Sequence, residues 1–430
     1  LGWPDETPDY QYFYPTTMME TGYDILFFWV ARMIMMGLEL TGEIPFSTVY
    51  LHGLVRDEHG QKMSKTKGNV IDPIEVMDEM GTDALRFTML VGSTPGKNTN
   101  LDMAKVEANR NFANKVWNAG RFVLGNFEQA PAQPAAEPDW TLADSWIWAR
   151  MQDLIRNVER LFTNHQYGEA GRQIYDFFWG DYADWYLETA KEQIAQGGDR
   201  AFYTIETLIR VLDISLRLLH PFTPYVTEEL WQHLKKAVEN SPFADRLTDW
   251  PEALMIAPWP ETRKEEDWEE NKIKDFELVQ DVVRTIRNLR AEKNVPPGHL
   301  IPAVFAAEDY LEILQEESRV IASLAQLDKE QIEIYPALEE KPRGHVALVA
   351  GPVEIYLPLK GLVDPEEERI RLKNELQETN SQIKRLKNLL AGPFAEKAPQ
   401  EVVQKERDKL KNYLETAETI QEQLAMLDEA

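Results

Sequence analysis

Three lysines stand within six residues in the run 62–67, Lys-Met-Ser-Lys-Thr-Lys, and a glycine lies on either side of them at Gly60 and Gly68. The β-branched segment 48–55 just upstream predicts a strand that anchors this loop. Lysine carries a mobile point charge, and a basic loop with flexible ends can close over a polyphosphate and stabilise the charge that grows as a phosphate bond breaks. Two lysines at this spacing are by themselves more often a solvated surface turn, so the neighbouring residues must decide.

The loop resembles the second signature of the class I aminoacyl-tRNA synthetases, which reads Lys-Met-Ser-Lys-Ser. Thr66 replaces the last serine and keeps its hydroxyl group. The runs 68–73 and 81–86 are similar to the same family. The resemblance implies that Lys65, and secondarily Lys62, stabilise pyrophosphate while ATP and an amino acid form an aminoacyl-adenylate.

The same resemblance implies ATP as a substrate and Mg²⁺ as the ion that accompanies it. It assigns a set of residues to the ATP or adenylate site: Lys65, Ser64, Met63, His52, Gly53, Gly22 and Asp24.

Residues 20–33 resemble the strand–helix junction of the synthetase subgroup that activates branched aliphatic amino acids. In that subgroup Gly22 permits close backbone approach, and Asp24 lies near the ribose or the amino acid. A carboxylate suits both, because it accepts hydrogen bonds from a hydroxyl pair or an ammonium group. Trp29 is predicted to line the amino-acid pocket together with Asp24, although a tryptophan in an apolar run is more often part of the core.

Three features favour the valyl enzymes within this subgroup. The amino-acid sequence of residues 22–33 is most similar to theirs, and the tail 364–430 resembles their C-terminal arm. The absence of cysteine disfavours the zinc-bearing tail of isoleucyl enzymes. The partners implied are valine and tRNA(Val). An isoleucyl relative remains the alternative, since no single residue decides the amino acid.

The seven histidines bear on the other half of such a site. A class I synthetase also carries a His-x-Gly-His element, and no histidines here have that spacing. The insertion that hydrolyses wrongly activated amino acids has no counterpart either. We therefore expect the chain to need the N-terminal half of the same enzyme for activity, the complete enzyme being a monomer. A noncatalytic tRNA-binding module with a vestigial lysine loop is the competing function.

Composition limits the remaining classes of protein. At 430 residues the chain is long enough for several packed units, and 43% hydrophobic with 28% charged residues is typical of globular proteins. The formal charge of −27 argues against a nonspecific nucleic-acid binder, so RNA contacts must be local. The chain has no cysteine and no histidine pair at metal-ligand spacing, so we predict no metal site within the protein. We expect no membrane segment and a cytoplasmic location.

The predicted fold is multidomain, α/β followed by mainly α structure. The four units expected are the C-terminal half of a Rossmann-type nucleotide fold at 1–102, a helical-bundle anticodon-binding domain at 103–265, a small α+β domain at 266–363 and an antiparallel coiled-coil hairpin at 364–430. Helical periodicity is strongest at 106–127, 144–161, 170–194 and 203–219. A shorter helix is expected at 82–90, and strands are expected at 300–306, 331–335, 346–350 and 353–359. Aromatic residues of the bundle, such as Phe177, Phe178 and Tyr182, are candidates for stacking on anticodon bases, but core packing is the expectation for most of them.

The tail shows the clearest period. Leu or Ile recur at 372, 376, 383, 386 and 390, with Thr379 in the same series, as a coiled-coil seam requires. A breaker at Gly392-Pro393 predicts that a second helix folds back. We expect a tRNA-binding arm, with a dimerisation coil as the alternative. The basic residues expected to contact tRNA phosphates are Lys384, Arg385, Lys387, Lys405, Arg407, Lys409 and Lys411.

Overall fold

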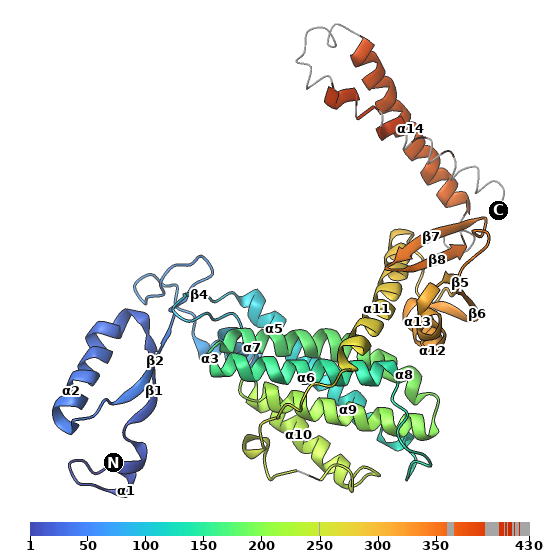
Figure 1. Ribbon diagram of the computed structural model, residues 1–430. Helices are drawn as coiled ribbons and strands as arrows, with labels where there is room; N and C mark the ends of the chain where they lie inside the picture. The colour runs from blue at the N-terminus through green and yellow to red at the C-terminus, as the bar shows by residue number, and fades with distance from the viewer. Residues whose placement is uncertain are drawn as a thin grey trace. The chain divides into compact units, whose positions relative to one another are not determined.

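The computed structural model describes residues 1–248, 250–358, 365–391, 404–407, 409–410, 412–414, 417 and 421 (Figure 1). The chain divides into two compact units, Leu1–Ile273 and Lys274–Ala430. Within the described part, the structure is mostly helical with small sheets. No described helix has the length and apolar character needed to cross a membrane.

The first unit opens with α1 (Pro8–Phe13) and the parallel strand pair β1 (Thr16–Gly22) and β2 (Phe46–His52). Parallel strands need a crossover, and here it consists of the short 3₁₀ and π turns η1 (Tyr23–Ile25) and η2 (Leu26–Val30) followed by α2 (Ala31–Thr41). Gly42 ends α2 in the left-handed conformation, with φ of 76°. The register pairs Gly22 with His52, so the carboxyl ends of both strands meet.

The predicted strand at 48–55 is wrong at its end. The pairing of β2 stops at His52, and a separate short strand, β3 (Val55–Arg56), pairs in parallel with β4 (Thr99–Asn100). After this break the pairing partner changes: residues 53–56 run beside residues 97–101 and no longer continue along β1. Two short helices follow β3, α3 (Pro73–Met80) and α4 (Thr82–Leu90), the second with the bounds predicted from the sequence.

Long helices then form a bundle, in which Figure 1 shows them lying alongside one another. The elements are α5 (Met103–Gly125), η3 (Phe127–Gln129), α6 (Leu142–Thr163), α7 (Tyr167–Asp176), η4 (Phe177–Tyr186), α8 (Leu187–Ile194), α9 (Gly198–Leu219), α10 (Pro224–Glu239) and η5 (Leu254–Ile256). The core is aromatic and fully buried at Trp146, Phe178 and Trp231.

The helix predicted at 170–194 contains a feature that periodicity missed. Its middle, η4, is a π-helix of ten residues, wider than the α-helical turns before and after it. Phe177, Phe178 and Tyr182 of this segment are buried, which confirms the expectation of core packing. These rings are therefore not available to stack on RNA bases.

A carboxylate of α4 caps a helix of the bundle. Asp83 accepts hydrogen bonds from the backbone N–H of Tyr225 (3.3 Å) and Val226 (2.6 Å), at the start of α10, whose own N-cap residue Thr223 makes no side-chain cap. Burial raises the pKa of Asp83, and the two N–H donors oppose that shift. Arg86, one turn further along α4, donates to the carbonyl groups of Pro221 and Phe222. These polar bonds fix α4 against the turn that precedes α10.

We predict that Asp83→Ala destabilises the first unit by about 1–2 kcal/mol, the usual loss when a helix cap is removed. The free energy of unfolding in denaturant measures it. Asp78→Ala on the exposed face of α3 is the control and should change stability by less than about 0.5 kcal/mol. Equal stability of the two variants would contradict the capping role.

The second unit contains most of α11 (Glu269–Glu292), which begins in the first unit, and a four-stranded sheet. The strands β5 (Ile301–Ala306), β6 (Leu327–Tyr335), β7 (His345–Ala350) and β8 (Val353–Pro358) lie in the order β6-β5-β8-β7. Between β5 and β6 run η6 (Glu308–Tyr310), α12 (Leu311–Glu316) and α13 (Ser318–Ala325). The predicted strands at 300–306, 331–335, 346–350 and 353–359 are confirmed over their described residues.

The tail begins with α14 (Pro365–Ala391). Thr379, Ile383 and Leu386 of the predicted seam are buried, whereas the basic residues Lys384, Arg385 and Lys387 are exposed. Described residues between 404 and 421 are helical as well, among them the exposed Lys405, Arg407 and Lys409. Lys411 lies outside the described residues, as do positions 403, 420, 424 and 427, where the heptad pattern of the predicted second helix continues. The hairpin therefore stays a prediction.

Candidate active site

Four of the predicted site residues come together where β1 and β2 end. Gly22 and His52 are register partners on the two strands, and Asp24 follows Gly22 in η1. A Cβ atom on Gly22 would lie 2.8 Å from an Asp24 carboxylate oxygen and 3.6 Å from His52 Cε1. The absence of a side chain at Gly22 therefore leaves room for both neighbours. The Nζ atom of Lys62 lies 3.9 Å from Asp24 Oδ2, which brings the lysine loop to the same strand ends.

This arrangement combines opposite charges at an open edge. Asp24 and Lys62 are both substantially exposed, and His52 Nε2 lies 3.3 Å from Glu20 Oε1. His52 Nδ1 lies 2.8 Å from its neighbouring carbonyl, Gly53 O. An ammonium group, a carboxylate and an imidazole within reach of one another can bind a polar ligand that carries both phosphate and hydroxyl or amino groups. No group of three or more His, Cys, Asp or Glu side chains among the described residues is placed to hold a metal ion.

Gly53, the residue after His52, lies so close to the backbone of Lys97 that no side chain fits there. A Cβ atom there would lie 1.7 Å from the carbonyl oxygen of Lys97 and 2.2 Å from its carbon. The adjacent Leu54 N–H donates to Asn98 Oδ1 at 2.8 Å, and Thr99 N–H donates to Leu54 O at 3.0 Å. Only glycine fits at residue 53 unless one of the two chain segments moves.

The lysine loop is held at its base by one buried carboxylate. Asp57 Oδ1 accepts the backbone N–H of Gln61 (2.7 Å) and His59 (3.1 Å), and Asp57 Oδ2 accepts Asn69 Nδ2 at 2.8 Å. The Asn69 amide oxygen in turn accepts the backbone N–H of Ser64 at 2.9 Å. The Asn69 side chain thus links the Asp57 carboxylate to Ser64 in the middle of the loop, and these hydrogen bonds hold the two ends of the segment 57–69 together.

These bonds explain the acid–base properties of Asp57. The hydrogen bond from Asn69, together with the two backbone N–H groups, lowers the pKa of Asp57 below its ordinary value of 3.8. A carboxyl with a lowered pKa stabilises the folded state above its unfolded pKa. That contribution is lost as the pH falls through the lower, folded value. The loop should therefore keep its shape at neutral pH and loosen only in acid, below pH 4.

The lysines of the loop are placed differently. Lys62 pairs with Arg56 in a short β-bridge and reaches Asp24. Lys65 is exposed in the turn and forms no ion pair with any residue that the structure describes. The hydroxyl groups of Ser64 and Thr66 lie 3.1 Å apart, and Ser64 also accepts the N–H of Lys67 at 3.3 Å. Lys65 therefore offers an unengaged ammonium group at the tip of a bonded turn.

Met63 is partly buried and packs against the apolar cluster of Val76, Leu85 and Val106, so its side chain anchors the loop. Its contact with a nucleotide stays a prediction. Trp29 is 52% exposed in η2, so it is not a core residue of this chain. Its place in an amino-acid pocket stays a prediction.

Sequence reasoning missed the link between Asp57 and Asn69. The run 57–60, Asp-Glu-His-Gly, has the aspartate and glycine that favour the first and last positions of a β-turn, so the turn itself was predictable. The partner twelve residues away was not, because nothing local marks Asn69 as the amide that bridges the carboxylate to Ser64.

An exchange of these two side chains tests the link. We predict that Asp57→Asn lowers the free energy of unfolding of the first unit by about 1–3 kcal/mol, since it leaves a buried donor without an acceptor. The new amide N–H₂ would face the N–H₂ of Asn69, and the Asn69 amide cannot turn over without breaking its hydrogen bond with Ser64. The double variant Asp57→Asn with Asn69→Asp restores donor and acceptor and should recover most of the stability, as measured by unfolding in denaturant. Failure of the double variant to recover would refute the hydrogen-bond account.

Three parts of the chain match known protein families. Residues 1–102 match the family described as tRNA synthetases class I (I, L, M and V), 144–304 the anticodon-binding domain of tRNA ligase, and 364–428 the valyl tRNA synthetase tRNA binding arm. The valine–tRNA ligase of Carboxydothermus hydrogenoformans is 43% identical over 99% of this chain, and that of Symbiobacterium thermophilum 44% identical over 99%. The chain is a homologue of the valine–tRNA ligases.

The matching portion of the valyl-tRNA synthetases is a C-terminal one, with the class I segment first and the tRNA-binding arm last. The chain spans about half the length of the curated relatives it matches, 47% and 48% for these two. Among solved structures, methionyl-tRNA synthetase of Mycobacterium tuberculosis in complex with methionyl-adenylate is similar over 61% of this chain and 52% of its own, at 23% identity and a TM-score of 0.47.

Proposed function

We propose that this chain is the C-terminal portion of a valine–tRNA ligase that attaches valine to tRNA(Val) through a valyl-adenylate. The observation that carries the proposal is the junction of the lysine loop with the ends of β1 and β2, where Lys62 lies 3.9 Å from Asp24. Ligands of open parallel sheets bind at the carboxyl ends of the strands. ATP is proposed to bind there, with Gly22, His52 and Gly53 beside it.

Lys65 and Lys62 have the principal roles in the proposed reaction. As the valine carboxylate attacks the α-phosphate, the bond to the β-phosphate breaks and charge accumulates on the departing pyrophosphate. Lys65, with an unengaged ammonium group, is proposed to stabilise that charge, and Lys62 to assist it. Mg²⁺ is proposed to enter with the ATP phosphates, because proteins usually hold it through one or two carboxylates together with substrate phosphates.

The upstream half of the enzyme is proposed to cover the apolar surface of η2 and α2. Phe27, Phe28 and Met35 are 76%, 64% and 69% exposed, and both β1 and β2 have an unpaired edge in a sheet of two strands. Two parallel strands alone rarely make a stable sheet, since parallel sheets are covered on both faces. Added strands would extend the sheet and convert the surface around Trp29 into a wall of the valine pocket.

The experiment that tests the function is amino-acid-dependent exchange of pyrophosphate into ATP. This chain alone is compared with the chain joined to the upstream half of a curated relative, with valine, isoleucine and leucine as substrates. We expect exchange only in the joined form, and fastest with valine. Fastest exchange with isoleucine would identify an isoleucyl relative. No exchange in either form, with tRNA binding retained, would support a noncatalytic tRNA-binding module.

The arm is proposed to bind tRNA through the exposed basic residues of α14 and of the helical residues 404–407 and 409–410. We predict that removing residues 364–430 weakens tRNA(Val) binding at least tenfold, as expected when several phosphate contacts are lost, and leaves pyrophosphate exchange unchanged. Filter binding and exchange assays on the joined enzyme measure the two effects. Loss of exchange would show that the arm supports the fold, and a change in solution mass would favour the dimerisation alternative.

A further inference from the structure

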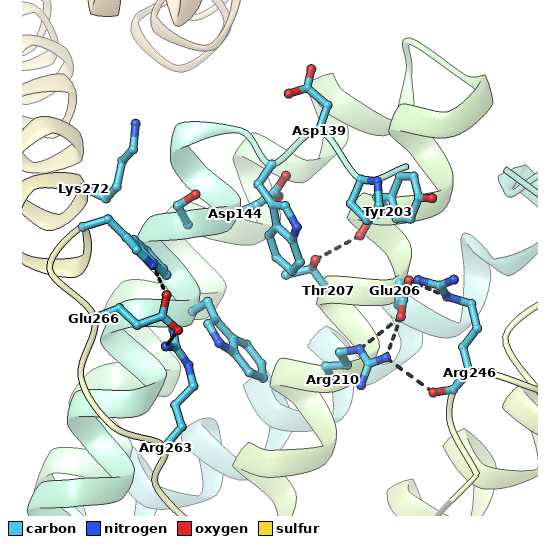
Figure 2. A pocket seen from close by; sticks show the side chains of 15 residues that line it. Asp139, Asp144, Tyr203, Glu206, Thr207, Arg210, Arg246, Arg263, Glu266 and Lys272 are labelled. Atoms are coloured by element: carbon cyan, nitrogen blue, oxygen red, sulfur yellow. Dashed lines mark hydrogen bonds and ion pairs between the residues drawn. The ribbon is translucent and has the colours of Figure 1, made fainter. Parts of the chain in front are cut away.

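A cavity of about 680 Å³ opens on the first unit, between α6, α9 and the segment that leads into α11 (Figure 2). This volume falls in the range of small-molecule sites. Four aromatic side chains contribute to its lining, Trp140, Trp148, Tyr203 and Trp268. None of the lining residues belongs to the proposed ATP site at the ends of β1 and β2. The cavity therefore calls for a ligand of its own.

One wall of the cavity presents two guanidinium groups held by a single buried carboxylate. Glu206 is 5% exposed, and its two oxygens accept hydrogen bonds from Arg210 Nη2 at 2.6 Å and from Arg246 Nε at 3.0 Å. Figure 2 shows Glu206 between the two arginines. Because two positive groups share one negative group, this wall keeps one net positive charge.

The same wall offers hydrogen-bond donors that the protein leaves unused. Both terminal nitrogens of Arg246, and Nη1 of Arg210, make no hydrogen bond to another residue that the structure describes. The two arginine side chains are 38% and 40% exposed, so a ligand can reach them. The planar fork of a guanidinium matches the two oxygens of a carboxylate. Arg246 can therefore bind a carboxylate through its terminal nitrogens while its Nε remains bonded to Glu206.

The other side of the cavity limits the charge of a ligand. Trp268 Nε1 donates to Glu266 at 2.6 Å, and Arg263 pairs with Glu266 and with Glu269, the latter at 2.8 Å. In Figure 2, Arg263 and Glu266 lie across the cavity from the paired arginines. The positive charge of Arg263 is thus already matched within the protein. A second negative charge on a ligand would meet Glu266 and the exposed Asp139, so a single carboxylate fits best.

We propose that this cavity binds a small aromatic carboxylate, with the carboxylate on Arg246 and Arg210 and the ring system packed against the tryptophans. The indole and phenol rings provide flat apolar surfaces that suit an aromatic ring. A cationic ligand would be repelled by the net positive charge of the arginine wall. A neutral apolar ligand would cover the guanidinium donors without bonding to them. The site lies outside the proposed ligase reaction and uses none of its residues.

The test measures binding of naphthylacetate to this chain by isothermal titration calorimetry, beside two analogues. Naphthylacetamide keeps the rings but is neutral, and cyclohexylacetate keeps the carboxylate but has no aromatic ring. We expect naphthylacetate to bind about tenfold more tightly than the amide, because charge-assisted hydrogen bonds are roughly twice as strong as neutral ones. It should bind about fivefold more tightly than cyclohexylacetate, because ring pairs add to apolar burial. No binding of naphthylacetate, or equal affinity for the amide, would overturn the proposal.

Two variants locate the binding in the cavity. Arg246→Gln removes the guanidinium donors while Arg210 keeps Glu206 paired, so it should weaken naphthylacetate about tenfold and leave naphthylacetamide unchanged. A cavity that had merely collapsed would lose both ligands equally, and that result would contradict the role of Arg246. Trp140 is 51% exposed, so Trp140→Ala removes a ring at little cost to folding and should weaken both ligands about fivefold.

Matched controls lie outside the cavity. Tyr225→Ala removes a ring that is 65% exposed, and Arg160→Gln removes an exposed arginine of α6. Both should bind naphthylacetate within about twofold of the unchanged chain, since neither residue lines the cavity. Full affinity of both cavity variants would overturn the site. The proposed ligase function would remain intact, because pyrophosphate exchange tests it separately.

A free acid and the C-terminal phenylalanine of a peptide both present an aromatic ring close to a carboxylate. The peptide Gly-Gly-Gly-Phe, titrated in the same way, distinguishes the two sources. We expect the peptide to bind more weakly than naphthylacetate, because ordering its flexible backbone costs conformational entropy. Peptide binding tenfold tighter than that of naphthylacetate would contradict the assignment to a small molecule, because the cavity would then be part of a peptide site.

Discussion

Lys65→Ala is expected to lower the rate of valine activation about 10²-fold in the chain joined to its upstream half, the usual loss on removing one preorganised charge stabiliser. The reason lies in the loop. Lys65 is exposed and makes no ion pair with the described residues, while Asp57 and Asn69 hold the loop that carries it. Because the charge it meets develops only as pyrophosphate departs, the effect should fall on the rate and not on valine binding. Pyrophosphate exchange and valine titration measure the two quantities.

Lys67→Ala is the matched control for this prediction. Lys67 stands in the same loop, is also exposed and forms no ion pair with the described residues, but its backbone N–H closes the turn on Ser64. Its substitution should change the rate by less than about threefold if position, and not charge alone, decides the effect. An unchanged rate in Lys65→Ala would remove the assigned role of the loop. Equal losses in both variants would point to general electrostatic attraction of ATP.

Gly53→Ala is expected to destabilise the first unit by about 3 kcal/mol, the upper end of the cost of forcing a methyl group into a packed site. The methyl carbon would lie 1.7 Å from the Lys97 carbonyl oxygen, an atom of the backbone that no rotation of a side chain can move. The chain must separate residues 53–56 from 97–101, which breaks the bonds of Leu54 to Asn98 and Thr99. The melting temperature should fall by roughly 6–12 °C, as measured by calorimetry.

Gly92→Ala gives the comparison for backbone flexibility alone. A Cβ atom at Gly92 would meet nothing within 4 Å, and its φ does not lie in the left-handed region. Alanine there should leave stability unchanged or raise it by about 0.5 kcal/mol, because it restricts the unfolded chain. Equal melting temperatures for Gly53→Ala and the unchanged chain would mean that residues 53 and 97 are not in contact.

The sequence predicted those parts of the fold that depend on local periodicity. The helix at 82–90 has the bounds expected, and α5, α6 and α9 begin within about five residues of their predicted starts because apolar residues recur at helical spacing. The strands β5, β7 and β8 follow from short β-branched runs. The π stretch η4 was not predicted, since a wider turn leaves no separate signal in the residue pattern.

From the sequence alone we could predict which residue types form the candidate site, because they follow from short-range spacing: the lysines of the loop, the carboxylate at Asp24 and the glycines at 22 and 53. The tertiary structure alone decided which groups meet. Asn69 bridges Asp57 to Ser64, and the backbone of Lys97 excludes a side chain at Gly53. Glu206 accepts a hydrogen bond from Arg246, which stands forty residues later in the sequence. Such contacts arise when packed elements bring distant segments of the chain together. The position of each side chain in such a contact is fixed by the packing of its own helix or strand, and the local sequence pattern does not show that packing.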